Sequence, residues 1–270
     1  VLNVSSGIGV LGDPSQNQTL AVPEPLIAGG VAGSVSHQWQ RLDQNQNWVA
    51  IAGATGTQLL LDESLVGQSV RVLVNYLDED EVPRYRASLA TGTVANINDA
   101  PTSTLTVVGS AIQNEMLVVD GAISDADGLG SLGYQWQASD DGAVWTNISG
   151  ANAGSIALGQ PHVGKHLRAA VSYVDGHGAG EAVIVECANV VQNVNDAPVV
   201  TALILAPDAQ EDVPYQFVID AEYFSDIDPE DVLNFSATLA SGTALPSWLT
   251  FDPATRSFQG SPTNSDLGDI

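Results

Sequence analysis

A six-residue stretch that occurs twice constrains this chain most. It reads Asn-Ile-Asn-Asp-Ala-Pro at 96–101 and Asn-Val-Asn-Asp-Ala-Pro at 193–198, so the two copies are 97 residues apart (193 − 96). The same offset separates bulky residues, because Trp136 lies 97 residues after Trp39 and Trp145 lies 97 residues after Trp48. A fixed period over large side chains indicates a tandem array rather than one large domain. We call 96–101 the first linker and 193–198 the second linker.

The two linkers predict three domains. The first covers residues 1–101, the second 102–198, and the third 199–270. Short runs that alternate apolar and polar residues fill the first two, separated by Gly, Asn and Asp, which is the pattern of β-strands and turns. The first domain should form strands at 35–40, 48–51, 58–61, 69–76 and 88–95, with one helical turn at 62–67. The second should form strands at 105–108, 116–119, 133–138, 145–148, 155–158, 166–173 and 182–191.

This strand pattern predicts an all-β chain of tandem immunoglobulin-like or cadherin-like β-sandwiches in an extended array. About seven short strands per hundred residues, with a Trp in the third, are typical of the immunoglobulin-like sandwich. Trp39 and Trp136 should then lie in the cores. An aromatic platform that stacks on a sugar or a peptide is the alternative for these two residues. Cys187 is the single cysteine, so no internal disulfide can brace the domains.

The charge of the chain limits its partners. Seven Lys and Arg stand against 32 Asp and Glu, which leaves a formal net charge of −25. Such a chain repels nucleic acid and anionic membrane surfaces, and no apolar run is long enough to span a bilayer. Cations are the expected partners, together with neighbouring domains of a longer chain from which this piece is cut.

Residues 1–198 resemble the immunoglobulin-like repeats of giant bacterial surface adhesins of the RTX type. The motifs that carry the resemblance are Tyr134–Gln137, Trp145–Ile148, Val163–Arg168 and Asn195–Pro198. The third segment, with Trp248 and Phe251 as expected core residues, resembles the dystroglycan-type cadherin-like domain. Members of that family continue with a long last strand, so the domain should be truncated at its C-terminus, where the chain stops at Ile270. The resemblance implies a secreted protein on the bacterial surface.

Paired acids point to a hard cation. Asp125-Ala126-Asp127 and Asp226-Ile227-Asp228 each place two carboxylates in one loop. Calcium takes six to eight oxygen ligands from carboxylates, amides and carbonyls. The sequence shows none of the imidazole or thiolate sets typical of zinc or copper. Ca²⁺ is therefore the expected cofactor, although solvated turn acids are the alternative for any single pair.

The layout also resembles cadherin junctions, and the resemblance implies the ligands. At the first linker these are Asn98, Asp99, Glu115, Asp125 and Asp127, and at the second Asn195, Asp196, Glu211, Asp226 and Asp228. Asp78 and Asp175 end strands before each linker and are further candidates for the first and second linker, respectively. The positions of the first domain that match Asp125 and Asp127 are Ala28 and Gly30, so no site is expected at its N-terminal end.

These features favour a non-catalytic extender segment of an adhesin, stiffened by calcium, that positions a ligand-binding region. The four His residues lie apart in sequence and match no catalytic motif, so the chain is not expected to be an enzyme. One alternative is that one of the modules, with the third as the first candidate, binds a host or surface glycan or peptide. Another is an accessory domain of a secreted hydrolase.

Overall fold

The computed structural model describes residues 8–23, 31, 33–228, 230–266 and 268. Ala28, Gly30 and Ile270, on which two of the expectations above depend, lie outside these residues. Among the described residues, helix is limited to four 3₁₀ turns of three residues, and the rest of the regular structure is antiparallel sheet. These turns are η1 (Glu63–Leu65), η2 (Gln160–His162), η3 (Ala221–Tyr223) and η4 (Asn264–Asp266). The predicted all-β class is confirmed.

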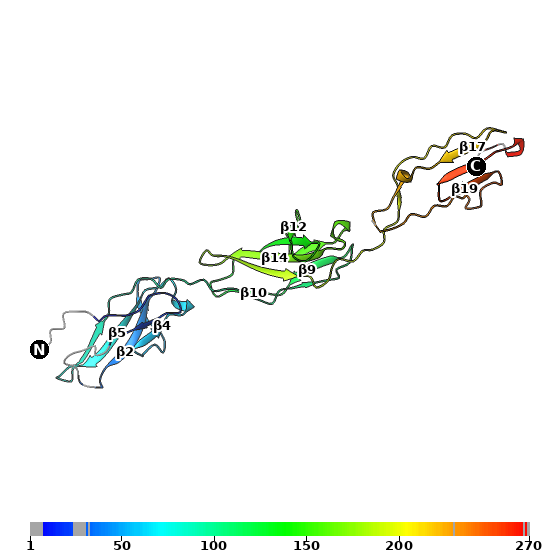
Figure 1. Ribbon diagram of the computed structural model, residues 1–270. Helices are drawn as coiled ribbons and strands as arrows, with labels where there is room; N and C mark the ends of the chain where they lie inside the picture. The colour runs from blue at the N-terminus through cyan, green and yellow to red at the C-terminus, as the bar shows by residue number, and fades with distance from the viewer. Residues whose placement is uncertain (1–7, 24–30, 32, 229, 267, 269–270) are drawn as a thin grey trace. The chain divides into compact units, whose positions relative to one another are not determined.

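The first repeat forms two sheets, coloured blue to cyan in Figure 1. Its strands are β1 (Thr19–Ala21), β2 (Ser36–Leu42), β3 (Trp48–Ala50), β4 (Gln58–Leu60), β5 (Val70–Leu77) and β6 (Pro83–Ala87). One sheet pairs β1 with β4, and the other has the order β3-β2-β5-β6. The helical turn expected at 62–67 is η1.

The strand expected at 88–95 differs from the structure. The edge strand β6 ends at Ala87, and beyond it Ser88 and Thr91 bind β5 through both backbone and side chain. Their N–H groups donate to the carbonyls of Val72 and Val70, each at 2.9 Å. The hydroxyls of Ser88 and Thr91 accept from the N–H groups of Val72 (3.0 Å) and Val70 (3.1 Å). The two hydroxyls take the N–H groups of β5 that a regular ladder would pair with backbone carbonyls, so this segment lies along β5 without forming the strand expected there.

The second repeat has the same plan as the first. Its strands are β7 (Thr102–Ser103), β8 (Thr106–Val108), β9 (Met116–Asp120), β10 (Ile123–Ser124), β11 (Gly133–Ser139), β12 (Thr146–Asn147), β13 (Ser155–Ala157), β14 (His166–Val174) and β15 (Gly180–Glu186). The sheet β12-β11-β14-β15 matches β3-β2-β5-β6 in order. The register also matches, because Trp39 is opposite Val72 and Trp136 is opposite Ala169, again 97 residues later.

Trp39 and Trp136 are core residues, as predicted. Both side chains are fully buried. Each indole N–H donates to a backbone carbonyl at 3.0 Å, that of Gly56 for Trp39 and that of Ala153 for Trp136. A buried indole with its one donor satisfied cannot stack on a glycan, so the platform alternative does not hold for these two residues.

The third segment carries shorter strands. They are β16 (Val199–Val200), β17 (Tyr215–Val218), β18 (Phe224–Ser225), β19 (Leu249–Asp252) and β20 (Ser257–Gly260). They form a pair, β16-β18, and a sheet of order β17-β20-β19. The ring of Trp248 meets Tyr215 edge-on at 6.3 Å, and Phe251 packs on Phe258 at 4.7 Å. Both residues are half-buried, as contacts on one face of a small sheet would make them.

By its contacts the chain divides into two compact units. The first holds residues 1–109, 117–156 and 166–188, and the second holds 110–116, 157–165 and 189–270. The first linker therefore belongs to the first unit, with most of the second repeat, and the second linker belongs to the second unit. The three-domain division at the linkers remains a prediction. Over the described ranges, no helix has both the length and the apolar character that a membrane crossing requires.

Candidate metal centre

Asp127 lies at the centre of the first linker's contacts. It follows β10 in a tight turn, in which its N–H donates to Asp125 Oδ1 at 3.0 Å. Its Oδ2 accepts from the N–H of Asp99 at 2.6 Å, and the residue is only 3% exposed. A carboxylate that holds a backbone N–H of the linker in this way anchors the linker to the turn.

The loop between β14 and β15 lies against the same turn. Asp175 Oδ1 accepts from the N–H groups of His177 (2.8 Å) and Ala179 (2.9 Å), which closes the loop. The N–H of Gly176 donates to the carbonyl of Asp127 at 2.9 Å. Although burial acts to raise the pKa of Asp175, its backbone donors hold that pKa below the ordinary value, so the carboxylate is charged at neutral pH.

Four buried oxygens around the first linker have no hydrogen-bond donor. They are Asp127 Oδ1, Asp175 Oδ2, Glu63 Oε2 and Asn96 Oδ1. Asp127 and Asp175 are 3% and 7% exposed, so water reaches these carboxylates poorly. An unpaired buried polar atom costs free energy, and a buried charge costs more. Oxygens of this kind are what a bound cation would satisfy.

Asp125 is held by a different partner. The hydroxyl of Tyr173 donates a short hydrogen bond to Asp125 Oδ2. Burial raises the pKa of Tyr173 and the bond to Asp125 raises it further, so the phenol keeps its proton. With Oδ1 accepting from Asp127, both oxygens of Asp125 already have donors. This carboxylate is fixed in place by protein groups.

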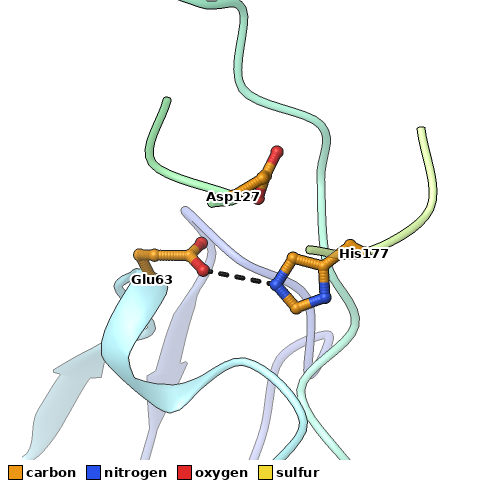
Figure 2. A group of neighbouring side chains, drawn as sticks. All are labelled: Glu63, Asp127 and His177. Carbon is orange, nitrogen blue, oxygen red and sulfur yellow. Dashed lines mark ion pairs between the residues drawn. The ribbon is translucent and has the colours of Figure 1, made fainter. Parts of the chain in front are cut away.

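A second group of possible ligands shares Asp127. Glu63, Asp127 and His177 each offer one atom, and these atoms all lie within 4.8 Å of one another. Figure 2 shows the three side chains, with Glu63 Oε1 facing His177 Nε2 at 3.4 Å. Glu63 begins η1, which the buried Leu65 anchors to the core of the first repeat. Three separate segments therefore bring these side chains together.

Two polar side chains fix the linker itself. Gln16 is 2% exposed. Its Oε1 accepts from the N–H of Ile97 at 2.9 Å, and its Nε2 donates to Asp99 Oδ2 at 2.7 Å. Asn98 Nδ2 donates to Glu181 Oε1 at 2.7 Å. The amide of Asn98 thus binds a carboxylate, while its carbonyl oxygen is the atom that a cation could use.

The two repeats differ at this end of the fold. In the first repeat, Asp78 is paired with Arg84 at 2.8 Å, and this ion pair holds the pKa of Asp78 below its ordinary value. In the second repeat, the matching positions are Asp175 and Glu181, two acids. The basic partner is therefore missing where the first linker arrives. A cation from solution would offset the charge of these two acids.

The second linker repeats part of the arrangement. Asp228 Oδ2 accepts from the N–H of Asp196 at 2.7 Å, and the N–H of Asp228 donates to Asp226 Oδ1 at 3.0 Å. The bond from Asp196 is the main cause of the lowered pKa of Asp228, which is 4% exposed. Asp226, Asp228 and Asp231 place carboxylate oxygens within 4.8 Å of one another.

Gln160 occupies the position that matches Glu63. Its Nε2 donates to Asp228 Oδ1 at 3.2 Å and to the carbonyl of Ile227 at 3.3 Å. At the second linker an uncharged amide thus meets the buried Asp, whereas a second carboxylate does so at the first. The two linkers therefore differ in charge at this point.

The structure places two predicted ligands, Asp78 and Asp175, differently from the expectation. The carboxylate of Asp78 accepts hydrogen bonds from Arg84 and from N–H groups of its own loop, and it does not contact the first linker. Asp175 lies with the first linker, next to Asp127, and not with the second. These placements follow from topology, because the loop after β14 lies beside the turn after β10.

Glu115 also does not join Asp125 and Asp127. Strand β9 runs between them, and its five extended residues span about 16 Å. Glu115 is exposed in the second compact unit, two residues from Gln113, whose Nε2 donates to Asp196 Oδ2 at 2.9 Å. It is therefore near the second linker. Glu211 is separated from Asp226 by β17 in the same way, and its neighbour Asp212 donates from its N–H to the carbonyl of Pro262.

Several residues of these sites were not predicted from the sequence. They are Gln16, Glu63, Gln113, Gln160, His177 and Asp231. Gln16 and Gln113 are 97 residues apart and make the same pair of bonds to their linkers. The 97-residue period of the sequence could therefore have identified these two glutamines. Glu63, His177 and Asp231 carry no repeated pattern, so only the folded chain shows their positions.

The comparisons with known proteins bear on the third segment. Residues 197–270 match the family He_PIG, described as "Putative Ig domain". The chain thus contains an immunoglobulin-like domain in this region, and the finer dystroglycan-type assignment stays a prediction. No curated protein matches the chain. Among solved structures, a marsupial T cell receptor is similar over 96% of this chain and 94% of its own, with 14% identity and a TM-score of 0.33, which does not establish a shared fold.

Proposed function

We propose that this chain is a non-catalytic extender segment of a bacterial cell-surface adhesin, and that Ca²⁺ bound beside its two linkers stiffens it. The immunoglobulin-like match at 197–270 supports an extracellular, non-catalytic module. The repeated strand order and the nearly identical sequences of the two linkers support a tandem array. The adhesin family and its surface location rest on the sequence resemblance alone.

The observation that carries the calcium proposal is the set of buried oxygens without donors at the first linker. Asp127 Oδ1 and Asp175 Oδ2 are carboxylate oxygens, and Asn96 Oδ1 is an amide oxygen. All three are ligand types that Ca²⁺ prefers. Asp99, Asn98 and Asp125 complete the proposed set around the same linker.

At the second linker the proposed ligands are Asp196, Asp226, Asp228 and Asp231, with Asn195 beside them. The group Asp226, Asp228 and Asp231 consists of oxygen donors only. Glu115 joins this region through its place next to Gln113. Glu211 leaves the proposed set, because β17 separates it from Asp226.

The physical role of the ion follows from its position beside a linker. Without it, several carboxylates repel one another, and the linker is held by few bonds, such as that from Asp99 to Asp127. With the ion bound, its ligands join the linker to the β-sandwich. Extracellular modules bind Ca²⁺ with dissociation constants of about 0.1–1 mM, and at ten times that concentration a site adds about 1.4 kcal/mol to stability. Stiffness should change more than stability.

Small-angle X-ray scattering of the whole chain in calcium and in chelator tests the proposal. We expect a narrower distribution of distances in calcium, because the linkers then move less. Asp127→Asn should lose much of this response, whereas Asp120→Asn, at an exposed position of β9, should keep it. Identical scattering profiles with and without calcium would show that the linkers are not stiffened by the ion.

A further inference from the structure

The group of Glu63, Asp127 and His177 differs chemically from the rest of the acidic surface. It includes an imidazole nitrogen, His177 Nε2, which lies 3.4 Å from Glu63 Oε1. Calcium is a hard cation that takes oxygen ligands, whereas imidazole suits zinc and other transition metals. The donor set is therefore that of a different class of metal from the one proposed above.

We propose that Glu63, Asp127 and His177 form a binding site for a borderline divalent cation of the Zn²⁺ class. The inference goes beyond the calcium proposal and shares only Asp127 with it. Two carboxylates and one His give three protein ligands, which is the number found in zinc sites that keep a position open for water. One carboxylate bridging two neighbouring ions would allow both cations to bind at this linker.

Geometry supports the assignment. Zinc binds His nitrogen and carboxylate oxygen at about 2.0–2.2 Å, so two ligand atoms of a tetrahedral site are separated by about 3.4 Å. The separation of His177 Nε2 from Glu63 Oε1 is 3.4 Å, and Asp127 has an atom within 4.8 Å of both. The site needs only a small inward movement of Asp127 or of the other two.

Burial gives a second and independent reason. Asp127 is 3% exposed, and its Oδ1 has no donor, while Glu63 Oε2 is also buried without one. His177 Nε2 lies within reach of Oε1 of Glu63 only, so Oε2 of Glu63 has no donor in either protonation state of the imidazole. A divalent cation would neutralise both carboxylates and would bind the neutral imidazole.

The surrounding fold holds the three ligands in place before any metal binds. His177 sits in the loop that Asp175 closes through the N–H groups of His177 and Ala179. Glu63 is fixed by η1, where Asp62 Oδ1 accepts from the N–H of Ser64 at 3.0 Å. The turn around Asp127 is fixed by Asp125. A preformed ligand set of this kind lowers the ordering cost of binding.

The second linker has no equivalent of this site. Gln160 stands where Glu63 does, and its amide donates to Asp228. Among the described residues the group around Asp228 offers carboxylates alone. The proposal therefore places a zinc-class site at the first linker and none among the described residues of the second.

Nitrogen NMR of the histidine side chains tests the proposal directly on the whole chain. Zn²⁺ is added to one equivalent in the presence of excess Ca²⁺, and the ring nitrogens of His37, His162, His166 and His177 are followed. We expect the Nε2 resonance of His177 to shift and the other three histidines to stay unchanged. A shift at another histidine, or displacement of Zn²⁺ by Ca²⁺, would overturn the assignment.

Calorimetric titration with Zn²⁺ gives the affinity. Loss of an outer partner of a metal ligand already weakens binding by 10- to 100-fold, so His177→Gln should weaken it by about tenfold or more. His166→Gln is the matched control and should bind as the unchanged protein does. The stiffening proposal is tested separately by scattering in calcium, so zinc binding without stiffening, or stiffening without zinc binding, tells the two ideas apart.

Discussion

Gln16 shows how a single neutral side chain can decide where a linker lies. It accepts from Ile97 and donates to Asp99, and Gln113 does the same for Val194 and Asp196 at the second linker. An amide suits this role because it carries a donor and an acceptor at one end. A carboxylate of similar size could accept from the backbone N–H, but it would repel the Asp of the linker.

We expect Gln16→Leu to destabilise the first compact unit by about 1–3 kcal/mol, because it leaves the Ile97 N–H and the Asp99 carboxylate without partners. Urea unfolding followed by tryptophan fluorescence measures the loss. Cleavage by subtilisin between residues 96 and 99 should also become faster. Gln18→Leu, at an exposed position nearby, should leave both properties unchanged. Equal effects of the two substitutions would contradict the role given to Gln16.

The sequence predicted residue roles well where a repeat supported them. Trp39 and Trp136 are buried as expected. Asp127 and Asp228 lie at the linkers to which they were assigned and accept backbone N–H groups there, while their role as metal ligands stays a prediction. Glu115 was misplaced because similar spacing from a linker does not show which end of a strand a residue occupies. The position of His177 was unpredictable, since the side chains near it, Glu63 and Asp127, come from segments with no sequence relationship to it.

At the scale of the element, the loop between β14 and β15 depends on one glycine. The N–H of Gly176 donates to the carbonyl of Asp127, and a Cβ at this position would lie 2.6 Å from that oxygen. Real Cβ atoms do not approach an oxygen so closely, so a side chain must push the loop away from the Asp127 turn. The position needs glycine for space.

We therefore expect Gly176→Ala to cost about 1–3 kcal/mol of unfolding free energy, as overpacking does elsewhere, and to weaken metal binding at the first linker. Gly180→Ala is the matched control, because a Cβ there meets nothing within 4 Å. It should be neutral or stabilise the chain by up to about 1 kcal/mol. The midpoint of urea unfolding measures both. A Gly176→Ala protein as stable as Gly180→Ala would show that the loop and the turn do not pack as described.

Strands were predictable from alternation, and their ends were less so. The expected strand at 166–173 is β14 with one residue added, whereas the strand expected at 88–95 lies earlier in the chain, at β6. Alternation of apolar and polar residues marks a half-buried extended segment. It does not show whether the N–H groups of the neighbouring strand donate to backbone carbonyls or to Ser and Thr hydroxyls, which is the difference at Ser88 and Thr91.

At the scale of the whole molecule, calcium can act in two ways on a chain with a net charge of −25, by screening and by specific binding. Any salt screens repulsion among exposed carboxylates, and the Debye length is already about 8 Å at physiological ionic strength. Bound ions act differently, because they occupy specific oxygens such as Asp127 Oδ1. The two effects are separable, since screening depends on ionic strength and binding depends on the identity of the ion.

Scanning calorimetry of the chain distinguishes screening from binding. About 2 mM CaCl₂, above the dissociation constants of about 0.1–1 mM typical of extracellular sites, should raise the unfolding midpoint by about 2–8 °C if each site adds about 1.4 kcal/mol. NaCl of matched ionic strength should leave the midpoint almost unchanged. Asp228→Asn should lose the part of the calcium response that belongs to the second unit, while Asp208→Asn, exposed in the same unit, should keep it. If sodium raises the midpoint as much as calcium does, screening accounts for the effect and the linkers hold no specific ion.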